Sequence, residues 1–333
     1  MSNGRRMMIV KGNAVIRRWW NPVLPLAVLT CAVHAQDYPA KPIRMLNPLP
    51  AGGPTDILGR MIAQPVSEAL GKPIVTENRP GAAGNIAADL AAKAAPDGYT
   101  LFIAGVGNFA VNVSLFRKLP YDPLRDFAPI ALLATAPYVV AVHPSLPVKS
   151  TRDLIALAKS KPGALNFGAV TGNGAHLAAE LFKTAAAINI VHIPYKGAVL
   201  ATNDVISGLI QLTFASTPGV MPFVKSGKLR AIAITSAKRA AGQPALPTVA
   251  ETLAGFEATV WYGLVAPAGT PRAIIERLNG EIATAVKSPA LRERLIAADY
   301  EPAVGTPEQF GAFMKSEIEK WGRAVRISGA SAD

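Results

Sequence analysis

The chain has almost no cysteine: Cys31 is the only one among 333 residues, and it lies in an N-terminal segment with the layout of a secretion signal. Once that segment is removed, disulfide bonds, a thiol nucleophile and a cysteine-ligated metal are excluded. Only 17% of the residues are charged, yet beyond the N-terminus no apolar run approaches the roughly 20 residues of a membrane-spanning helix. The chain must rely on core packing, and it is long enough for two α/β domains.

Catalytic patterns are absent as well. Histidine occurs four times, at His34, His143, His176 and His192, and none stands in an HExxH motif. There is no GxSxG or SxxK element for a nucleophilic serine, and the first strand-to-helix junction has neither a GxxxxGK[ST] nor a GxGxxG motif for a nucleotide. We therefore expect no catalytic residue, no metal and no cofactor. His176 opens a predicted helix and is the histidine that we expect nearest to a ligand.

The first 35 residues predict export. They carry five basic residues and no acidic one, then an apolar stretch over 22–33, then Ala35 at the end of an AxA-like site. This layout is typical of a signal peptide cleaved after Ala35, and it places the mature protein in the periplasm. Removal of the segment lowers the net charge from +12 to +7, because 29 of the 34 basic residues remain against 22 acidic ones. These basic residues are dispersed, which argues against a nucleic-acid partner and leaves a mild positive field for a small anion.

Short apolar stretches alternate with Ala-rich helical ones along the mature chain, which predicts the α/β class with parallel βαβ units. The segments 135–159 and 259–279 resemble each other, because each is an apolar strand followed by a Pro-containing loop and a helix. We expect the chain to cross between two lobes there. One lobe is predicted over 36–137 plus 262–333 and the other over 138–261, with a ligand cleft between them at the carboxyl ends of the strands.

Five loops are expected at that edge, over residues 50–56, 105–108, 171–175, 194–197 and 216–219. They offer backbone amides and hydroxyls rather than catalytic groups. In the first loop, Gly52 and Gly53 can adopt positive φ and leave their amides uncovered, and a helix can begin at Thr55 or Asp56 with Asp56 as its N-cap. Such a turn suits an anion such as a carboxylate, although it can also serve only to reverse the chain.

Several motifs, read together, resemble one family. They are DYPAKPIRMLNPLPAGGPTDILGR, ENRPGAAGNIAA, PDGYTLFIAG, LPYDPLRDFAPI, GNGAHLAAELFK, IPYKGA, KSGKLRAIAITSAKR, LPTVAET and WYGLVAPAGTP. In this order, and over essentially the whole mature chain, they resemble the Bug family of TctC-like periplasmic substrate-binding proteins of tripartite tricarboxylate transporters. The resemblance implies a two-lobed periplasmic binding protein of the type II class, which closes on a carboxylate held by backbone amides, hydroxyls and ordered waters.

The resemblance also implies a set of ligand-binding residues. In the first lobe these are Pro50, Ala51, Gly52, Gly53, Thr55, Asp56, Gly105, Gly107 and Asn108. In the second lobe they are Thr171, Gly172, Asn173, Gly174, Tyr195 and Lys196. The cleft loops add Ser216, and His176 completes the expected site together with Ala215.

Two single residues and one three-residue loop depart from the family pattern. Leu49 stands where an aromatic residue is usual, Val106, Gly107 and Asn108 replace a more hydroxyl-rich loop, and Ala215 stands where many relatives have Asp. Without that carboxylate, a free amino acid is a poor ligand. We expect a small carboxylate with a neutral or apolar remainder near Leu49, Phe109 and Ala215.

The expected function is that of a monomeric, non-enzymatic receptor that captures an organic carboxylate and delivers it to the membrane subunits of a tripartite tricarboxylate-type transporter. Two other functions stay open, one for a receptor and one for an enzyme. The receptor could instead present its ligand to a sensor kinase, or the chain could be a secreted α/β enzyme that acts on a carboxylate. A scaffold that binds macromolecules is a third possibility.

Overall fold

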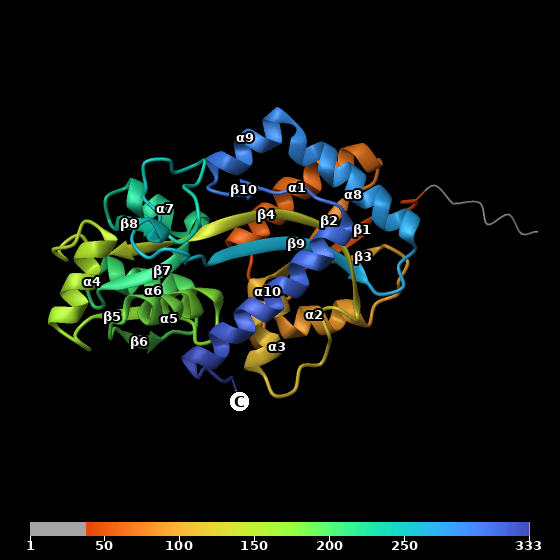
Figure 1. The fold of residues 1–333 in the computed structure, drawn as a ribbon. Helices are drawn as coiled ribbons and strands as arrows, with labels where there is room; N and C mark the ends of the chain where they lie inside the picture. Colours follow the sequence, from red (N-terminus) through yellow and green to blue (C-terminus); the bar gives the residue numbers. More distant parts are fainter. Residues whose placement is uncertain (1–37, 333) are drawn as a thin grey trace, which may run out of the picture. The chain divides into compact units, whose positions relative to one another are not determined.

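The structure is a computed structural model that describes residues 38–332, so the predicted signal peptide lies outside the described residues. Residues Asp37–Asp333 form one compact unit built on a ten-stranded sheet in the order β2-β1-β3-β9-β4-β7-β5-β6, with β10 and β8 also paired to β4 (Figure 1). Helices cover both faces of this sheet, which confirms the α/β class. Among residues 38–332, no helix combines the length and apolarity needed to cross a membrane.

The first part of the sheet contains β1 (Ile43–Asn47), β2 (Ile74–Asn78), β3 (Thr100–Gly105), β9 (Thr259–Pro267) and β10 (Glu301–Pro302). One face packs against α1 (Pro54–Leu70), α8 (Arg272–Lys287) and α9 (Pro289–Ala297). The other face packs against α2 (Asn85–Ala92), the π-helical turn η2 (Val106–Val111), α3 (Asn112–Leu115) and α10 (Pro307–Ser328), with the short turn η1 (Ala82–Gly84) before α2. Burial of apolar residues at helical spacing on each of these helices fixes the layers.

The second part contains β5 (Asn166–Ala169), β6 (Val191–Pro194), β7 (Leu212–Ser216) and β8 (Arg230–Ile234). The helices α4 (Thr151–Ser160) and α5 (Gly174–Ala186) share one core with α10. On the opposite face, α6 (Ala198–Ile206) and α7 (Thr217–Lys225) enclose a smaller core around Val139, Val205 and Met221. The short turn η3 (Val249–Glu251) leads toward β9.

The two parts share the 16-residue strand β4 (Phe127–Val142). From Phe127 to Pro137 this strand pairs with β9, and from Tyr138 to Val142 it pairs with β7 and β8. Proline cannot donate a ladder hydrogen bond, and Pro137 stands where the strand changes partners. The helix α10 contacts η2 and α3 on one side and α5 on the other, so it also spans both parts.

Two expectations about the elements are wrong. The strands are not all parallel, because β9 is antiparallel to β3 and β4, and β4 is antiparallel to β7 and β8. The chain enters the second part along β4 and returns along β9, so these two long strands run in opposite directions. The helix α7 was not expected at all, because Pro218, Gly219 and Pro222 make its sequence resemble a loop; Pro218 occupies the first turn, where a missing N–H costs little.

Candidate ligand site

The first predicted loop leads into α1, as expected, but the details differ. Gly52 has a φ of 78°, whereas Gly53 has a φ of −78° and is the N-cap of a helix that begins at Pro54. Thr55 and Asp56 therefore lie inside the first turn, and the expectation that Asp56 is the N-cap is wrong. Proline is suited to the first helical position because its φ is preset and its missing N–H has no helical partner to lose.

Asp56 holds this loop together. Its buried carboxylate accepts hydrogen bonds from the Gly52 N–H, Arg60 Nε and Asn78 Nδ2, each at 3.0 Å. Burial alone would raise the pKa of Asp56, but the hydrogen bonds from Arg60, Gly52 and Asn78 outweigh it and lower the pKa to about 2. The Gly52 amide is thus used inside the protein and is not uncovered, contrary to the expectation.

The amides that remain for a ligand are those of Gly53 and Thr55. Among the described residues neither has a hydrogen-bond acceptor, since the first helical bonds run from Asp56 and Ile57 to the Gly53 carbonyl. Both amides lie at the positive end of a 17-residue helix, which favours a carboxylate in front of them. The anion-binding character predicted for this loop therefore rests on the expected Gly53 amide and on the Thr55 amide in place of that of Gly52.

The second loop of the first part lies beside the first one. Asn108 is buried, and its Oδ1 accepts the Gly105 N–H at 2.8 Å, so its side chain shapes the turn at the start of η2. A Cβ on Gly84 would lie 3.0 Å from Pro48 Cβ and 3.4 Å from Asn108 Cβ. The segment 81–84 therefore closely approaches both predicted loops.

Sequence reasoning missed that segment as part of the site. Gly81, Ala82, Ala83 and Gly84 all have positive φ, including 45° and 54° at the two alanines. Consecutive left-handed non-glycine residues are strained and persist only where the surroundings hold them. The signal was present, because the motif RPGAAGN follows the strand β2 at the same carboxyl edge as the other loops.

In the second part, the predicted loop 171–175 is held by two local hydrogen bonds. Asn173 caps α5 by accepting the His176 N–H at 2.8 Å, and His176 Nδ1 accepts the Gly172 N–H at 3.1 Å. His176 is 5% exposed and lies against His192, with ring centroids 4.0 Å apart. Burial, then the charges of His192 and Lys183, lower the pKa of His176 to about 4. His176 is thus a neutral residue that supports the loop from within the fold.

Two other predicted residues of the second part, Tyr195 and Lys196, lie in the loop 194–197, and two more, Ala215 and Ser216, lie at the end of β7. The Tyr195 hydroxyl donates to Asp204 Oδ2 in α6 at 2.6 Å, and burial and Asp204 raise the pKa of Tyr195 to about 12. Its hydroxyl is therefore committed to its own half of the sheet, while Lys196 is exposed. Ala215 lies in the apolar core under α6 and α7, and Ser216 ends β7 beside the phenol of Tyr262.

Loops from the two parts of the sheet contact each other. A Cβ on Gly174 would lie 3.1 Å from Val106 Cγ1, and a Cβ on Gly172 would lie 2.4 Å from Leu115 Cδ2. At a second place, a Cβ on Gly219 would lie 3.9 Å from Pro54 Cγ. Four of the five predicted loops are thus brought together in two facing pairs. The loop 194–197 contributes Tyr195, which packs against Gly168 in its own part.

One predicted residue lies elsewhere. Phe109 is fully buried in an aromatic cluster with Phe102, Tyr121 and Phe127, and its ring centroid is 4.8 Å from that of Phe127. The expectation that Phe109 lies near the apolar end of a ligand is therefore wrong, because the side chain forms part of the core. Leu49 is 43% exposed and remains available at the rim of the first loop.

Two tyrosines beneath the loops were not predicted from the sequence. The Tyr300 hydroxyl donates to the Pro54 carbonyl at 2.6 Å, and its ring lies edge-on to Tyr262, which contacts Ser216. Each therefore supports a different predicted loop. Tyr262 could have been found, since it stands on one of the two segments where the chain was expected to cross between lobes.

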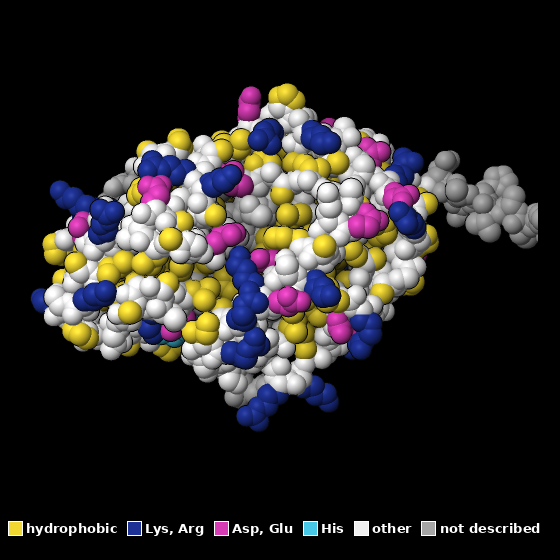
Figure 2. Space-filling view, viewed as in Figure 1, with side chains coloured by type: hydrophobic (Ala, Val, Ile, Leu, Met, Phe, Trp, Pro, Cys, Tyr) yellow, Lys and Arg dark blue, Asp and Glu magenta, His cyan; other side chains and the backbone are white. Residues whose placement is uncertain are grey.

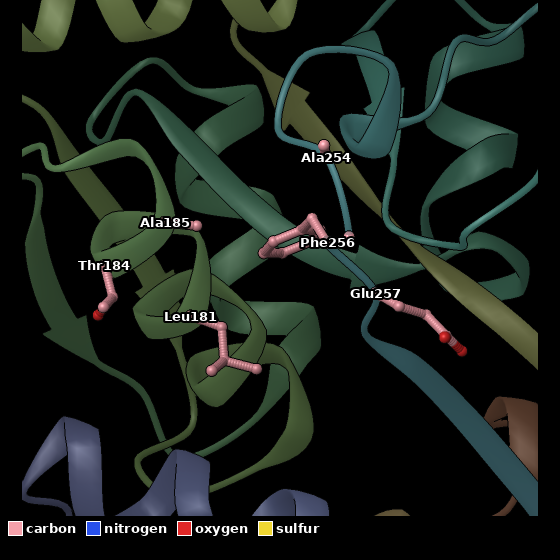
Figure 3. Close-up of a pocket in the computed structure, with 7 residues that line it drawn as sticks. Leu181, Thr184, Ala185, Ala254, Phe256 and Glu257 are labelled. Carbon is pink, nitrogen blue, oxygen red and sulfur yellow. The ribbon is translucent and has the colours of Figure 1, made fainter.

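Other features of the surface offer little chemistry. Figure 3 shows a pocket of about 280 Å³ where α5 meets the segment before β9, lined by Leu181, Thr184, Ala185, Ala254, Gly255, Phe256 and Glu257. None of these residues belongs to the predicted site.

Figure 2 shows basic side chains gathered over α10 with acidic ones beside them, so charges of both signs are mixed on this face. No group of three or more potential metal-ligating side chains occurs within residues 38–332.

Comparisons with known proteins agree with this architecture. The family model for the tripartite tricarboxylate transporter family receptor matches residues 58–329. BugT of Bordetella pertussis is 40% identical over 309 residues, which cover 91% of this chain and 94% of BugT.

Two solved structures carry bound acids. One is R. palustris Rpa4515 with adipate, at 36% identity and a TM-score of 0.83, covering 89% of this chain and 99% of that one. The other is MatC from Rhodopseudomonas palustris with bound malate, at 30% identity and a TM-score of 0.77, covering 86% and 100%. The family match confirms both the resemblance seen in the motifs and the expectation of a receptor rather than an enzyme. The chain belongs to the receptor family of the tripartite tricarboxylate transporters.

Proposed function

We propose that this protein is a periplasmic receptor that captures a small organic carboxylate and delivers it to a tripartite tricarboxylate-type transporter in the membrane. The observation that carries the proposal is the pairing of loops from both parts of the sheet around uncovered helix N-terminal amides. The Gly53 and Thr55 amides at the start of α1 have no acceptor among the described residues, and Pro54 lies opposite Gly219 at the start of α7. The acids bound by the two similar structures support a carboxylate as the ligand.

We further propose that the chain works as two lobes, over 36–137 plus 262–333 and over 138–261. The change of partners in β4 between Pro137 and Tyr138 supports this division, because β4 pairs with β9 before this point and with β7 after it. A ligand that contacts both lobes stabilises the closed arrangement by its differential affinity for it. The predicted ligand residues of loops 50–56, 105–108, 171–175 and 216–219 then form the closing surfaces.

Calorimetric titration of the purified mature protein with adipate, malate, hexanoate and butyrate tests capture. We expect micromolar or tighter binding of at least one acid, accompanied by a higher melting temperature, because a ligand that binds only the folded state stabilises it. Absence of binding by all four acids would contradict the proposal, and turnover of any of them would restore the enzyme alternative. Delivery is tested by uptake of the labelled acid into cells that lack the receptor and into cells that carry it.

A further inference from the structure

Tyr138 stands at the point where β4 passes from one part of the sheet to the other. Its side chain is 4% exposed, and its backbone pairs with Ser216 of β7. A Cβ on Gly174 would lie only 2.1 Å from the Tyr138 hydroxyl oxygen, so this hydroxyl touches the first residue of α5. Val106, from the opposite part of the sheet, also borders Gly174. Tyr138 therefore lies beneath the place where two predicted ligand loops meet.

The Tyr138 hydroxyl lacks a hydrogen-bond partner among the described residues. The hydrogen bonds at this position come from the backbone, between Tyr138 and Thr235. A buried phenol normally finds a partner, because its hydroxyl otherwise loses its water without compensation. Within residues 38–332, the fully enclosed side-chain polar atoms without a hydrogen bond are Asp89 Oδ1, which is ion-paired with Lys93 Nζ, and Trp261 Nε1. The Tyr138 hydroxyl is not one of these, so another molecule can reach it.

The start of α5 adds further donors beside this hydroxyl. Asn173 accepts the His176 N–H, but the Gly174 and Ala175 amides have no acceptor among the described residues. Two amides without an acceptor at the N-terminus of a 13-residue helix favour an oxygen that carries negative charge. Gly174 also lets the chain approach Tyr138 closely, which any side chain would prevent.

Tyr138 remains a donor at all physiological pH values. Burial raises the pKa of this phenol, and the charges of Tyr262 and Glu317 raise it further. Glu317 does not repel an incoming anion strongly, because its carboxylate accepts Trp321 Nε1 at 2.8 Å and Lys320 Nζ at 3.2 Å. A neutral hydroxyl and two amides are therefore available together.

We propose that the Tyr138 hydroxyl, together with the first amides of α5, binds an oxygen at the end of the acid remote from α1, and so selects acids with a second oxygen-bearing group. This inference rests on the proposed function. It assigns one carboxylate to the Gly53 and Thr55 amides and the remote oxygen to Tyr138. An acid with an apolar remote end leaves the Tyr138 hydroxyl and the α5 amides without a partner.

The test compares wild type, Y138F and G174A, with G280A as the control. Gly280 is an exposed glycine within α8, outside all the predicted loops, and a Cβ on Gly280 would meet no atom within 4 Å. Titrations use adipate with hexanoate, and malate with butyrate, as pairs that differ at the remote end. We expect Y138F to bind the diacid about ten-fold more weakly and the matched monoacid unchanged, as expected for one lost hydrogen bond to a charged group.

The glycine variants test the geometry. G174A should weaken both acids, because its methyl group must displace the Tyr138 hydroxyl, and G280A should weaken neither. The double variant G174A/Y138F should bind more tightly than G174A, because removal of the hydroxyl takes away the contact at 2.1 Å and leaves the methyl group 3.1 Å from Val106 Cγ1 and 3.2 Å from the Cζ atom at position 138. A double variant as weak as G174A, or weaker, would contradict the contact between these two residues.

Three further results would decide against the inference. An unchanged preference for diacids in Y138F would overturn it while the proposed function stands. A melting temperature of ligand-free Y138F several degrees below wild type would also overturn it, because the hydroxyl would then be bonded inside the fold. Failure of the wild-type protein to bind any of the four acids would contradict the proposed function itself, whereas binding of the monoacids without the diacids would overturn only the inference.

Discussion

The Asp56 carboxylate accepts the backbone N–H of Gly52 at 3.0 Å, across the turn that begins α1. The same carboxylate binds Arg60 and Asn78, so one buried charge connects the loop, the helix and the strand β2. The loop therefore keeps its shape without a ligand. Preorganisation of this kind lowers the ordering cost of binding.

Replacement of Asp56 by Ala should destabilise the protein by about 2–3 kcal/mol, because Arg60, Asn78 and the Gly52 amide lose a charged acceptor. It should also weaken carboxylate binding, since the loop that presents the Gly53 amide is no longer held. Urea denaturation and titration with the best-binding acid measure the two effects. The control is Glu276→Ala, which removes an exposed ion pair with Arg272 on α8 and should change neither. An Asp56→Ala protein with wild-type stability would show that the network contributes nothing.

His176 should make stability depend on pH. The folded protein protonates this residue near pH 4, whereas an unfolded chain does so near its ordinary value of 6.5. The unfolded state therefore binds more protons between these values, and the free energy of unfolding falls as the pH decreases from 6.5 toward 4. Above pH 6.5 the residue adds no pH dependence. At pH 5 the expected loss from this residue is about 2 kcal/mol.

Urea denaturation at pH 7.5 and pH 5.0 measures this loss, and the variant His176→Gln should reduce it. Glutamine keeps an acceptor for the Gly172 N–H but does not titrate. The groups around the imidazole, His192 on β6 and Glu180 and Lys183 on α5, are left in place. The control Thr184→Val on α5 removes an exposed hydroxyl that donates to the Glu180 carbonyl at 3.0 Å and removes no titrating group, so it should keep the wild-type pH dependence. Equal pH dependence in all three proteins would refute the assignment.

The strained segment 81–84 predicts an unusual response to glycine. Ala83 has a φ of 54°, so Ala83→Gly should relieve strain and stabilise the protein by up to about 1 kcal/mol. Ala185 is exposed within α5, and Ala185→Gly should destabilise it by about 0.5–1 kcal/mol. Thermal unfolding compares the two. Destabilisation of similar size by both substitutions would show that Ala83 is not strained.

The first loop, with Gly52 and Asp56, shows which features of the site could be predicted from the sequence and which could not. The positions of β1, α1 and the turn between them follow from apolar periodicity, proline and glycine, so the loop was predicted correctly. Which amides remain uncovered could not be predicted, because this depends on Asn78 and Arg60 meeting the Asp56 carboxylate in three dimensions.

The same limit applies elsewhere in the site. Tyr138 was visible on a predicted crossing strand, but its contact with Gly174 arises only when β4 and α5 pack together. Phe109 follows a glycine-rich turn, and its burial depends on Phe102 and Phe127 from neighbouring strands. Local patterns thus predict where loops fall, whereas the direction of each side chain is decided by tertiary packing.

Thr217, the first residue of α7, should contribute to stability through a contact between distant segments. Its hydroxyl donates to the Asp299 carbonyl at 2.8 Å, and Asp299 also accepts Gln243 Nε2 and Lys225 Nζ. Thr217→Val keeps the shape of the side chain but leaves this buried carbonyl without its donor. We expect a loss of about 1–3 kcal/mol in the free energy of unfolding.

Thr202 provides a matched comparison for Thr217, because it is also buried and its hydroxyl also donates to a backbone carbonyl, that of Ala198, at 3.0 Å. That bond lies within one turn of α6, where the Thr202 N–H can still satisfy the carbonyl after the hydroxyl is removed. Thr202→Val should therefore cost less than about 0.5 kcal/mol by urea denaturation. If the two variants lose the same free energy, the bond from Thr217 to Asp299 adds nothing beyond a local side-chain contact. A larger loss in Thr217→Val alone would establish that α7 is anchored to the segment before β10, and with it the loop that faces Pro54.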